Sequence, residues 1–252
     1  MANFPPLKNY ILYCLDRLIE QYGLEPPFLD VGCGIGDVSR HIASRGWRGT
    51  AIDTSGLAIE AAKKTLASLE AVKVRKEALS EADGTFKTIV VMDVLEHTED
   101  DQAALEKISS LLDRGGHVVI TVPSNPGEWR WDDVFYGHLR RYAPEEIKAR
   151  LANAGLEPLV IWDFTYPAFW IMRRLYTKWK SMPADVTQDE AARTEISSAV
   201  NAWDIPVVSW LLSGGSPFWK LVYRFQFDWF RGRLKDGFEM IVLARKPEKM
   251  SG

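Results

Sequence analysis

The stretch FLDVGCGIGD, residues 28–37, places largely apolar residues ahead of three glycines within five positions. Its first half is typical of a buried strand, and a helical pattern begins after Gly36. A strand that runs through glycines into a helix lets the backbone approach a ligand closely, and the first turn of the helix presents N–H groups without intrahelical partners. The stretch therefore predicts a ligand site at the end of a strand.

The spacing of the glycines restricts the kind of ligand. Dinucleotide sites use G-x-G-x-x-G, whereas Gly32, Gly34 and Gly36 are spaced G-x-G-x-G and Asp37 takes the sixth position. A carboxylate at this position would face a pyrophosphate of like charge in a confined site, which is unfavourable. The charge favours a cationic ligand, and S-adenosyl-L-methionine carries a sulfonium and an ammonium but no phosphate.

Strand and helix patterns alternate along most of the chain. The predicted strands cover residues 27–32, 49–55, 72–79, 87–97, 117–123, 157–164 and 238–246. The predicted helices cover residues 7–22, 37–46, 56–69, 99–116 (ended by its double glycine) and 143–156. Alternation of this kind implies parallel strands joined by right-handed crossovers. We therefore expect an α/β fold with a doubly wound sheet of seven strands and ligands at the carboxyl ends of the strands.

Composition excludes several classes of protein. A net charge of −3 over 252 residues gives no general attraction to nucleic acid. Cys14 and Cys33 are too few for a disulfide framework, which predicts a reducing cytoplasm. The N-terminus lacks the pattern of a secretory signal, and the longest uncharged run, residues 205–219, is shorter than a membrane-spanning helix. We expect a cytoplasmic protein with a small-molecule partner.

A second acidic position and a fourth-strand motif support the same ligand. Asp53 ends the second predicted strand, where a carboxylate can accept both ribose hydroxyls, and MDVLEH follows at residues 92–97. With the glycine spacing, residues 28–123 resemble class I S-adenosylmethionine-dependent methyltransferases. The motifs are most similar to the ubiquinone-biosynthesis O-methyltransferases and related small-molecule enzymes, over residues 28–162 and 238–246. The resemblance implies strand order 3-2-1-4-5-7-6 with an antiparallel last strand.

The resemblance also implies a set of cofactor contacts. Asp30 and the backbone of Gly32 and Gly34 would flank the methionine part, and Asp53 would bind the ribose. Either acid has an alternative role in capping the loop after its strand. Glu77 stands after the third strand, where related enzymes place an acid beside adenine. The remaining residues assigned to the cofactor site are Cys33, Gly36, Thr54, Ala78, Leu79, Met92 and Asp93.

Methyl transfer requires alignment of acceptor and methyl group, and a hydroxyl acceptor is helped by a general base. His97 and His138 follow the fourth and fifth strands, so both would lie at the ligand edge. Each has a structural alternative: His97 as a partner of a neighbouring group, and His138 as an organiser of its loop. The chain shows no spacing of ligands typical of a metal site.

Residues 165–237 interrupt the alternation and carry six of the ten tryptophans. We interpret 1–252 as one methyltransferase domain, with an N-terminal helix in 1–24 and 165–237 as a helical insertion between the last two strands. Boundary candidates are SMPADVTQDE at 181–190, whose TQDE matches a capping box, and SGGSP at 213–217. Ten Lys or Arg against seven Asp or Glu make the insertion locally positive. A cap over the substrate, a membrane-facing surface and a homodimer face stay open as its role.

The sequence therefore predicts a methyltransferase that uses S-adenosyl-L-methionine, releases S-adenosyl-L-homocysteine and methylates a small, hydrophobic or lipid-linked acceptor. We expect oxygen as the methylated atom, with nitrogen or carbon as open alternatives. Three alternatives are kept. A sugar or sugar-nucleotide acceptor would contact Arg140, Arg141 and Tyr142, a non-catalytic partner subunit would only bind the cofactor, and a nicotinamide-dependent oxidoreductase would bind a different one. The oligomeric state is a monomer or a homodimer.

Overall fold

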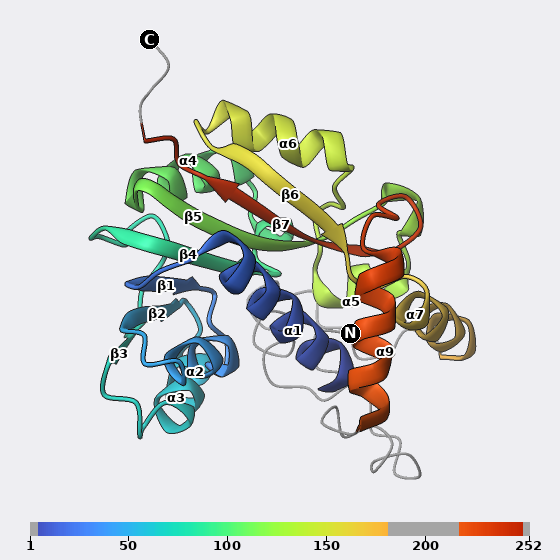
Figure 1. Ribbon diagram of the computed structural model, residues 1–252, viewed down its shortest axis with the longest axis horizontal. Helices are drawn as coiled ribbons and strands as arrows, with labels where there is room; N and C mark the ends of the chain where they lie inside the picture. The colour runs from blue at the N-terminus through green and yellow to red at the C-terminus, as the bar shows by residue number, and fades with distance from the viewer. Residues whose placement is uncertain (1–4, 181–216, 249–252) are drawn as a thin grey trace.

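The structure is a computed structural model that describes residues 5–180 and 217–248. Seven strands form one sheet in the order β3-β2-β1-β4-β5-β7-β6, and only the pairings of β7 with its neighbours are antiparallel (Figure 1). The predicted fold class and strand order are thus confirmed. The strands are β1 Phe28–Val31, β2 Gly49–Asp53, β3 Val72–Lys76, β4 Phe86–Met92, β5 Leu112–Pro123, β6 Glu157–Asp163 and β7 Glu239–Arg245.

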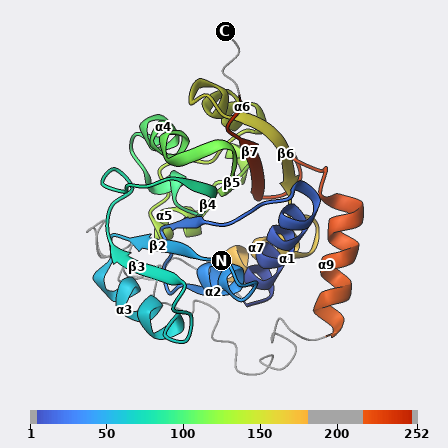
Figure 2. The ribbon, with the colours of Figure 1, turned by 60° about the vertical axis from the view of Figure 1, so that its left-hand side comes forward.

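Helices cover both faces of the sheet (Figures 1 and 2). On one face α4 and α6 pack over β1, β4, β5 and β7, and on the other α1, α2 and α9 form a second core. The helices are α1 Pro5–Tyr22, α2 Asp37–Ala43, α3 Gly56–Thr65, α4 Asp101–Leu111, α5 Trp131–Tyr136, α6 Pro144–Asn153, α7 Ala168–Trp179 and α9 Pro217–Phe230. Two 3-10 turns, η1 Leu95–His97 and η2 Pro126–Glu128, follow β4 and β5.

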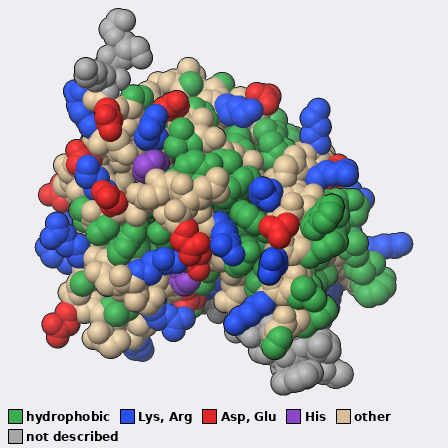
Figure 3. Space-filling model, viewed as in Figure 1, with side chains coloured by type: hydrophobic (Ala, Val, Ile, Leu, Met, Phe, Trp, Pro, Cys, Tyr) green, Lys and Arg blue, Asp and Glu red, His purple; other side chains and the backbone are tan. Residues whose placement is uncertain are grey.

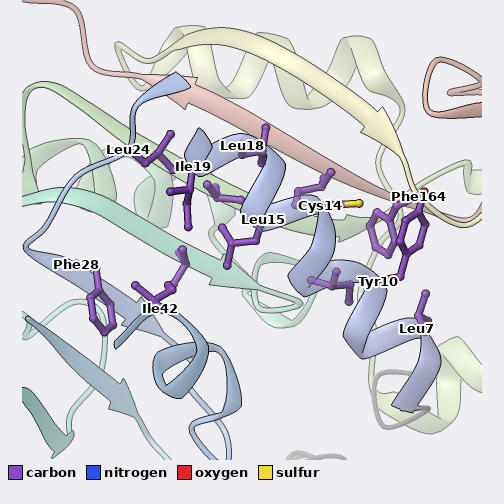
Figure 4. Packing of buried hydrophobic residues seen from close by; sticks show 14 of the residues in the cluster. Leu7, Tyr10, Cys14, Leu15, Leu18, Ile19, Leu24, Phe28, Ile42 and Phe164 are labelled. Carbon is purple, nitrogen blue, oxygen red and sulfur yellow. The ribbon is translucent and has the colours of Figure 1, made fainter. Parts of the chain in front are cut away.

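Helix α1 is part of the core rather than an appendage. Leu7, Tyr10, Cys14, Leu15 and Leu18, spaced by one helical turn or less, are all fully buried against the sheet (Figure 4). The ring of Tyr10 stacks on Tyr223 of α9 and Phe169 of α7. The first and last parts of the chain are therefore held together by apolar burial, which is the main stabilising term in folding.

Two predicted element boundaries are wrong. The double glycine does not end α4: the helix ends at Leu111, and Gly115 and Gly116 lie within β5. Backbone pairing explains this, because Gly115 N–H donates to Lys246 O and Lys246 N–H donates to Gly116 O. The fourth strand does not continue to His97, since Asp93 takes a φ of 55° and residues 95–97 form η1. The chain therefore turns after β4, and Leu95, Glu96 and His97 lie across the carboxyl edge of the sheet.

Helices α7 and α9 lie within the range predicted as an insertion, 165–237. The TQDE capping box and nearly all of both boundary candidates fall in 181–216, outside the described residues. Those boundaries and the domain division stay predictions. Among the helices of the described part, none combines the length and apolarity needed to cross a membrane.

The turn before β7 has no room for a side chain. A Cβ at Gly237 would stand 1.7 Å from Asp163 Oδ2, whose other oxygen accepts hydrogen bonds from the backbone of Thr165 and Tyr166. We expect Gly237→Ala to lower the free energy of unfolding by about 3 kcal/mol, because the buried Asp163 carboxylate would have to leave its hydrogen bonds. Gly232→Ala is the matched control, since its Cβ meets nothing within 4 Å. Equal denaturation midpoints for the two variants would contradict the expectation.

Candidate functional site

Two cavities adjoin at the carboxyl edge of the parallel strands. The larger has a volume of about 560 Å³ and lies over the ends of β2 and β3, and the smaller has about 190 Å³ and lies between η1, α1 and the start of β7. Gly32, Gly34, Asp93 and His97 line both. The glycine loop thus stands between two spaces that a cofactor and an acceptor can share.

The larger cavity gathers most residues predicted to hold the cofactor's adenosine. Asp53, Thr54, Glu77, Ala78 and Leu79 all line it. The Asp53 carboxylate accepts hydrogen bonds from Gly34 N–H at 2.9 Å and Ser55 N–H at 2.8 Å. These bonds fix the carboxylate while leaving lone pairs for a ligand, since each oxygen can accept more than one hydrogen bond. The arrangement fits a ribose diol.

Glycine is present at each of the three loop positions for a different local reason. Gly32 has a φ of 67°, and a Cβ there would lie 2.5 Å from Val94 Cγ2. At Gly36 (φ 84°) a Cβ would press on Ala62 of α3. Gly34 (φ 52°) has open space instead. The left-handed backbone therefore packs the loop tightly at both ends and presents its middle to the ligand.

Asp30 lies beneath the loop and lines neither cavity. Its carboxylate accepts a 2.6 Å hydrogen bond from Ser39 Oγ, and burial raises its pKa to about 7. Its predicted contact with the methionine part stays a prediction. Asp37 does line the smaller cavity, where it pairs with Lys8 of α1 and, at 3.2 Å, with Arg40. The acid that distinguishes this loop from a dinucleotide loop is thus at the ligand edge.

The smaller cavity brings the two predicted bases together. The rings of His97 and His138 lie 5.1 Å apart, although 40 residues separate them in the chain. His97 Nδ1 is 3.2 Å from Gly137 O, and burial, with the nearby His138, lowers the pKa of His97 to about 4. His97 is therefore neutral at physiological pH. Met92, Cys33 and Tyr136 complete this part of the wall.

His138 is oriented by a buried acid. Its Nδ1 lies 2.9 Å from Asp133 Oδ1, which fixes the ring and leaves Nε2 facing Glu96 Oε1 at 4.0 Å, too far for a hydrogen bond. Burial alone would raise the pKa of Asp133, but hydrogen bonds from His138 and Arg141 outweigh it and hold that pKa well below its usual range. An ionised acid behind a histidine favours the tautomer with its free nitrogen toward the cavity.

Two further carboxylates line the smaller cavity without partners. Neither oxygen of Glu96 nor Oε2 of Glu239 has a hydrogen-bond partner among the described residues, and the two residues are 1% and 8% exposed. Burial, with the charge of Asp93, raises the pKa of Glu239 to about 8 and that of Glu96 well above its usual value. Buried polar atoms without partners cost free energy, so these oxygens are suited to meet a donor from a ligand.

Asp133 and Glu239 escaped the sequence analysis. Asp133 carries a local signal, because an acid pair stands five residues before His138 in WDDVFYGH. Glu239 carries none, because it reaches the site only through the antiparallel pairing of β7 with β5 at Pro123. From the sequence, Glu96 in LEH was interpreted either as a base or as a partner of a backbone group or an arginine.

The residues predicted to contact a sugar acceptor line neither cavity. Arg141 is buried and donates to Ser124 O and Phe238 O, and the Tyr142 hydroxyl donates to Asp101 at 2.8 Å. Arg140 pairs with Asp101 at 3.1 Å. Their side chains hold the loop after β5 in place, and an acceptor contact by any of them stays a prediction.

Glu96, His97 and His138 have the donor types of a metal site. One ligand atom from each lies within 4.8 Å of the others. No spacing of this kind is visible in the sequence, because the three residues come from two segments 41 positions apart. The expectation of no metal site stays a prediction.

Comparison with known proteins identifies the fold's relatives. The family model described as Methyltransferase domain matches residues 9–160. The ubiquinone biosynthesis O-methyltransferase of Xanthomonas euvesicatoria pv. vesicatoria is 32% identical over an alignment of 149 residues, and the match covers 51% of this chain and 62% of that enzyme. The match thus spans less than two thirds of that relative's length.

Two solved structures share the fold. A putative sarcosine dimethylglycine methyltransferase from Galdieria sulphuraria aligns with a TM-score of 0.63 and 14% identity, covering 95% of this chain and 86% of the other. The N-methyltransferase NodS from Bradyrhizobium japonicum WM9, in complex with S-adenosyl-L-homocysteine, aligns with a TM-score of 0.53 and 22% identity, covering 64% and 80%.

The raised pKa of Glu239 predicts a pH-dependent stability. A group whose pKa is higher in the folded state stabilises fully below its unfolded pKa, and this contribution is lost as pH rises to the folded pKa of about 8. In the wild-type protein, the free energy of unfolding should therefore fall as the pH rises from 5 to 8. We expect this fall to be less steep in Glu239→Gln, by up to about 1.4 kcal/mol per pH unit. Urea titrations at each pH measure this, with exposed Glu106→Gln on α4 as control. An unchanged slope in Glu239→Gln would refute the expectation.

Proposed function

The chain belongs to the methyltransferase domain family, and on this premise we propose that it transfers a methyl group from S-adenosyl-L-methionine to a small, hydrophobic or lipid-linked acceptor, with oxygen as the methylated atom. The observation that carries the proposal is the junction of the two cavities. Residues suited to an adenosine line the larger one, and a histidine backed by a buried acid lines the smaller one.

The residues present fit the cofactor. Asp53 would hold the ribose, Glu77 with Ala78 and Leu79 the adenine, and the backbone around Gly34 the methionine part. Cys33, Thr54, Met92 and Asp93 line the same surfaces. The chemistry that S-adenosyl-L-methionine supplies when bound is an activated methyl group on a positively charged sulfur, with S-adenosyl-L-homocysteine as product. Asp37 and Asp93 at this edge favour a cationic ligand over a pyrophosphate.

The histidines would handle the proton of the acceptor. His138, held through Nδ1 by Asp133, has Nε2 available to take a proton from a hydroxyl in the smaller cavity. The developing imidazolium is stabilised by the ionised Asp133, as in other acid-backed histidines. His97 stays neutral and would exclude water and shape the pocket. The remaining requirement is alignment, which the shared wall of the two cavities supports.

Two observations support a hydroxyl-bearing acceptor. The unpartnered oxygens of Glu96 and Glu239 can accept hydrogen bonds from its O–H groups. The relatives named ubiquinone biosynthesis O-methyltransferases act at oxygen by their name. A sugar nucleotide fits less well, because its phosphates would meet acids in the smaller cavity while Arg140 and Arg141 are engaged elsewhere. A non-catalytic binding subunit would have no use for the Asp133–His138 arrangement.

The outer faces of α7 and α9 support contact with a membrane. Their exposed apolar side chains lie beside exposed Lys178, Lys220 and Arg224, and Figure 3 shows this gathering of hydrophobic and basic side chains. The exposed apolar residues are Ile171, Leu175, Trp179, Phe218, Leu221, Phe225 and Trp229. An apolar face with basic neighbours suits insertion among anionic headgroups, which would bring the site to a lipid-linked acceptor. We therefore favour a cytoplasmic, membrane-associated protein over a cap or dimer surface.

The base is tested by His138→Asn. We expect turnover to fall by about 10²- to 10⁴-fold, because Asn cannot accept the acceptor's proton. The measurement is transfer of labelled methyl from S-adenosyl-L-methionine to a panel of isoprenoid quinols, lipids and glycans, with calorimetry showing unchanged cofactor affinity. His41→Asn is the control, since His41 pairs with Asp16 of α1 and lines neither cavity. Full turnover in His138→Asn would remove the proposed base, and labelling of glycans alone would remove the proposed acceptor.

The membrane surface is tested with point variants that leave the core intact. Trp179 and Trp229 are 76% and 74% exposed. We expect replacement of both tryptophans by Gln to reduce severalfold the fraction of the protein that sediments with anionic phosphatidylglycerol vesicles. The reason is that the two apolar side chains that insert into the lipid are lost. Trp129→Gln, at a 43% exposed tryptophan outside α7 and α9, is the control. Wild-type protein that stays in the supernatant would refute membrane contact.

A further inference from the structure

Arg173 is a buried cation that has no role in the proposed cofactor site. It lies on α7, inside the aromatic insertion, and is 3% exposed. Its guanidinium donates two hydrogen bonds to Asp132, at 2.7 and 2.8 Å, one to Asp133 Oδ2 at 2.9 Å and one to Glu128 O at 3.0 Å. A buried arginine with four acceptors fixes whatever it binds, because its planar fork allows little rotation.

We propose that Arg173 is a positioning residue for methyl transfer: it holds the Asp133 carboxylate that orients His138, so that the insertion contributes to the active site. The proposal deepens the proposed function and rests on the role given there to His138. Arg173 touches neither cavity lining directly, so it acts through Asp133.

The contacts of Asp133 carry the argument. Oδ1 accepts from His138 Nδ1 at 2.9 Å and from Arg141 at 2.6 Å, and Oδ2 accepts from Arg173 at 2.9 Å and from Arg130 N–H at 2.7 Å. Arg141 and Arg173 therefore bind different oxygens of the Asp133 carboxylate. Without Arg173, Oδ2 keeps only the hydrogen bond from the Arg130 N–H, and the carboxylate is held less firmly in the orientation that presents Oδ1 to His138.

Charge balance gives Arg173 a second effect. Asp132 and Asp133 are balanced by Arg141 and Arg173, so the group is neutral when His138 is neutral. Loss of Arg173 would leave one buried carboxylate uncompensated beside the imidazole, which would favour protonation of His138. The other titratable groups that line the smaller cavity with His138 are Glu96 and His97 of η1, Tyr136 of α5, Asp93 after β4, Glu239 of β7, Lys8 of α1 and Asp37 of α2. The one lysine among them, Lys8, pairs with Asp37 and so does not replace Arg173.

The test follows the His138 imidazole by nitrogen-15 NMR titration of the full chain, which needs no acceptor. We expect Arg173→Met to raise the titration midpoint of His138 by about one pH unit. Arg174→Met is the matched control, because Arg174 is its neighbour but is exposed and pairs with Glu128 instead. Asp132→Asn should move the midpoint downward, since it leaves Arg173 uncompensated, and this conservative change also decides the matter should Arg173→Met fail to fold.

Each outcome of the titrations either supports or overturns the proposed role of Arg173. Opposite shifts in Arg173→Met and Asp132→Asn, with Arg174→Met unchanged, support the proposal, as does a downward shift in Asp132→Asn alone when Arg173→Met does not fold. A midpoint in folded Arg173→Met that matches Arg174→Met, or in Asp132→Asn that matches wild type, overturns it. Failure of the proposed base is seen elsewhere, as retained methyl transfer in His138→Asn, so the two failures are distinguishable.

Discussion

The close approach of the β1 loop to the end of β4 is the constraint on which the site depends. Gly32 adopts a left-handed backbone and leaves no space for a Cβ beside Val94. Because the loop lies directly against this turn, Gly32, Gly34, Asp93 and His97 form a common wall between the two cavities. A bulkier residue would separate the strand ends, and the proposed cofactor and acceptor spaces would no longer meet.

Buried charge divides the site into two chemically different parts. Around Asp133 every carboxylate oxygen is bonded, and the acid is held ionised. Across the smaller cavity, Glu96 and Glu239 have oxygens without partners and raised pKa values. The fully bonded Asp133 carboxylate is therefore rigid, whereas the Glu96 and Glu239 carboxylates respond to the ligand that binds beside them. This division suits a fixed base opposite a surface that recognises an acceptor.

The aromatic insertion joins the two halves of the chain. Tyr10 of α1 stacks on Tyr223 of α9, and Arg173 of α7 reaches the loop that bears His138. The inner side of these helices is therefore part of the core and of the proposed catalytic apparatus. Their outer side carries the exposed tryptophans. One pair of helices can thus serve both as support for the site and as the surface that meets a membrane.

The sequence by itself determined the fold class, the position of the glycine loop and the residues at the larger cavity. These depend on local patterns: the period of apolar residues reports burial, and the ends of parallel strands share one edge of a sheet. Only the tertiary structure decided that Glu239 joins Glu96 at the smaller cavity, that Arg173 holds Asp133 and that Arg141 and Tyr142 hold the loop after β5. Those contacts depend on the antiparallel pairing of β7 and on the packing of α7, which join residues too far apart in the chain for any local pattern to record.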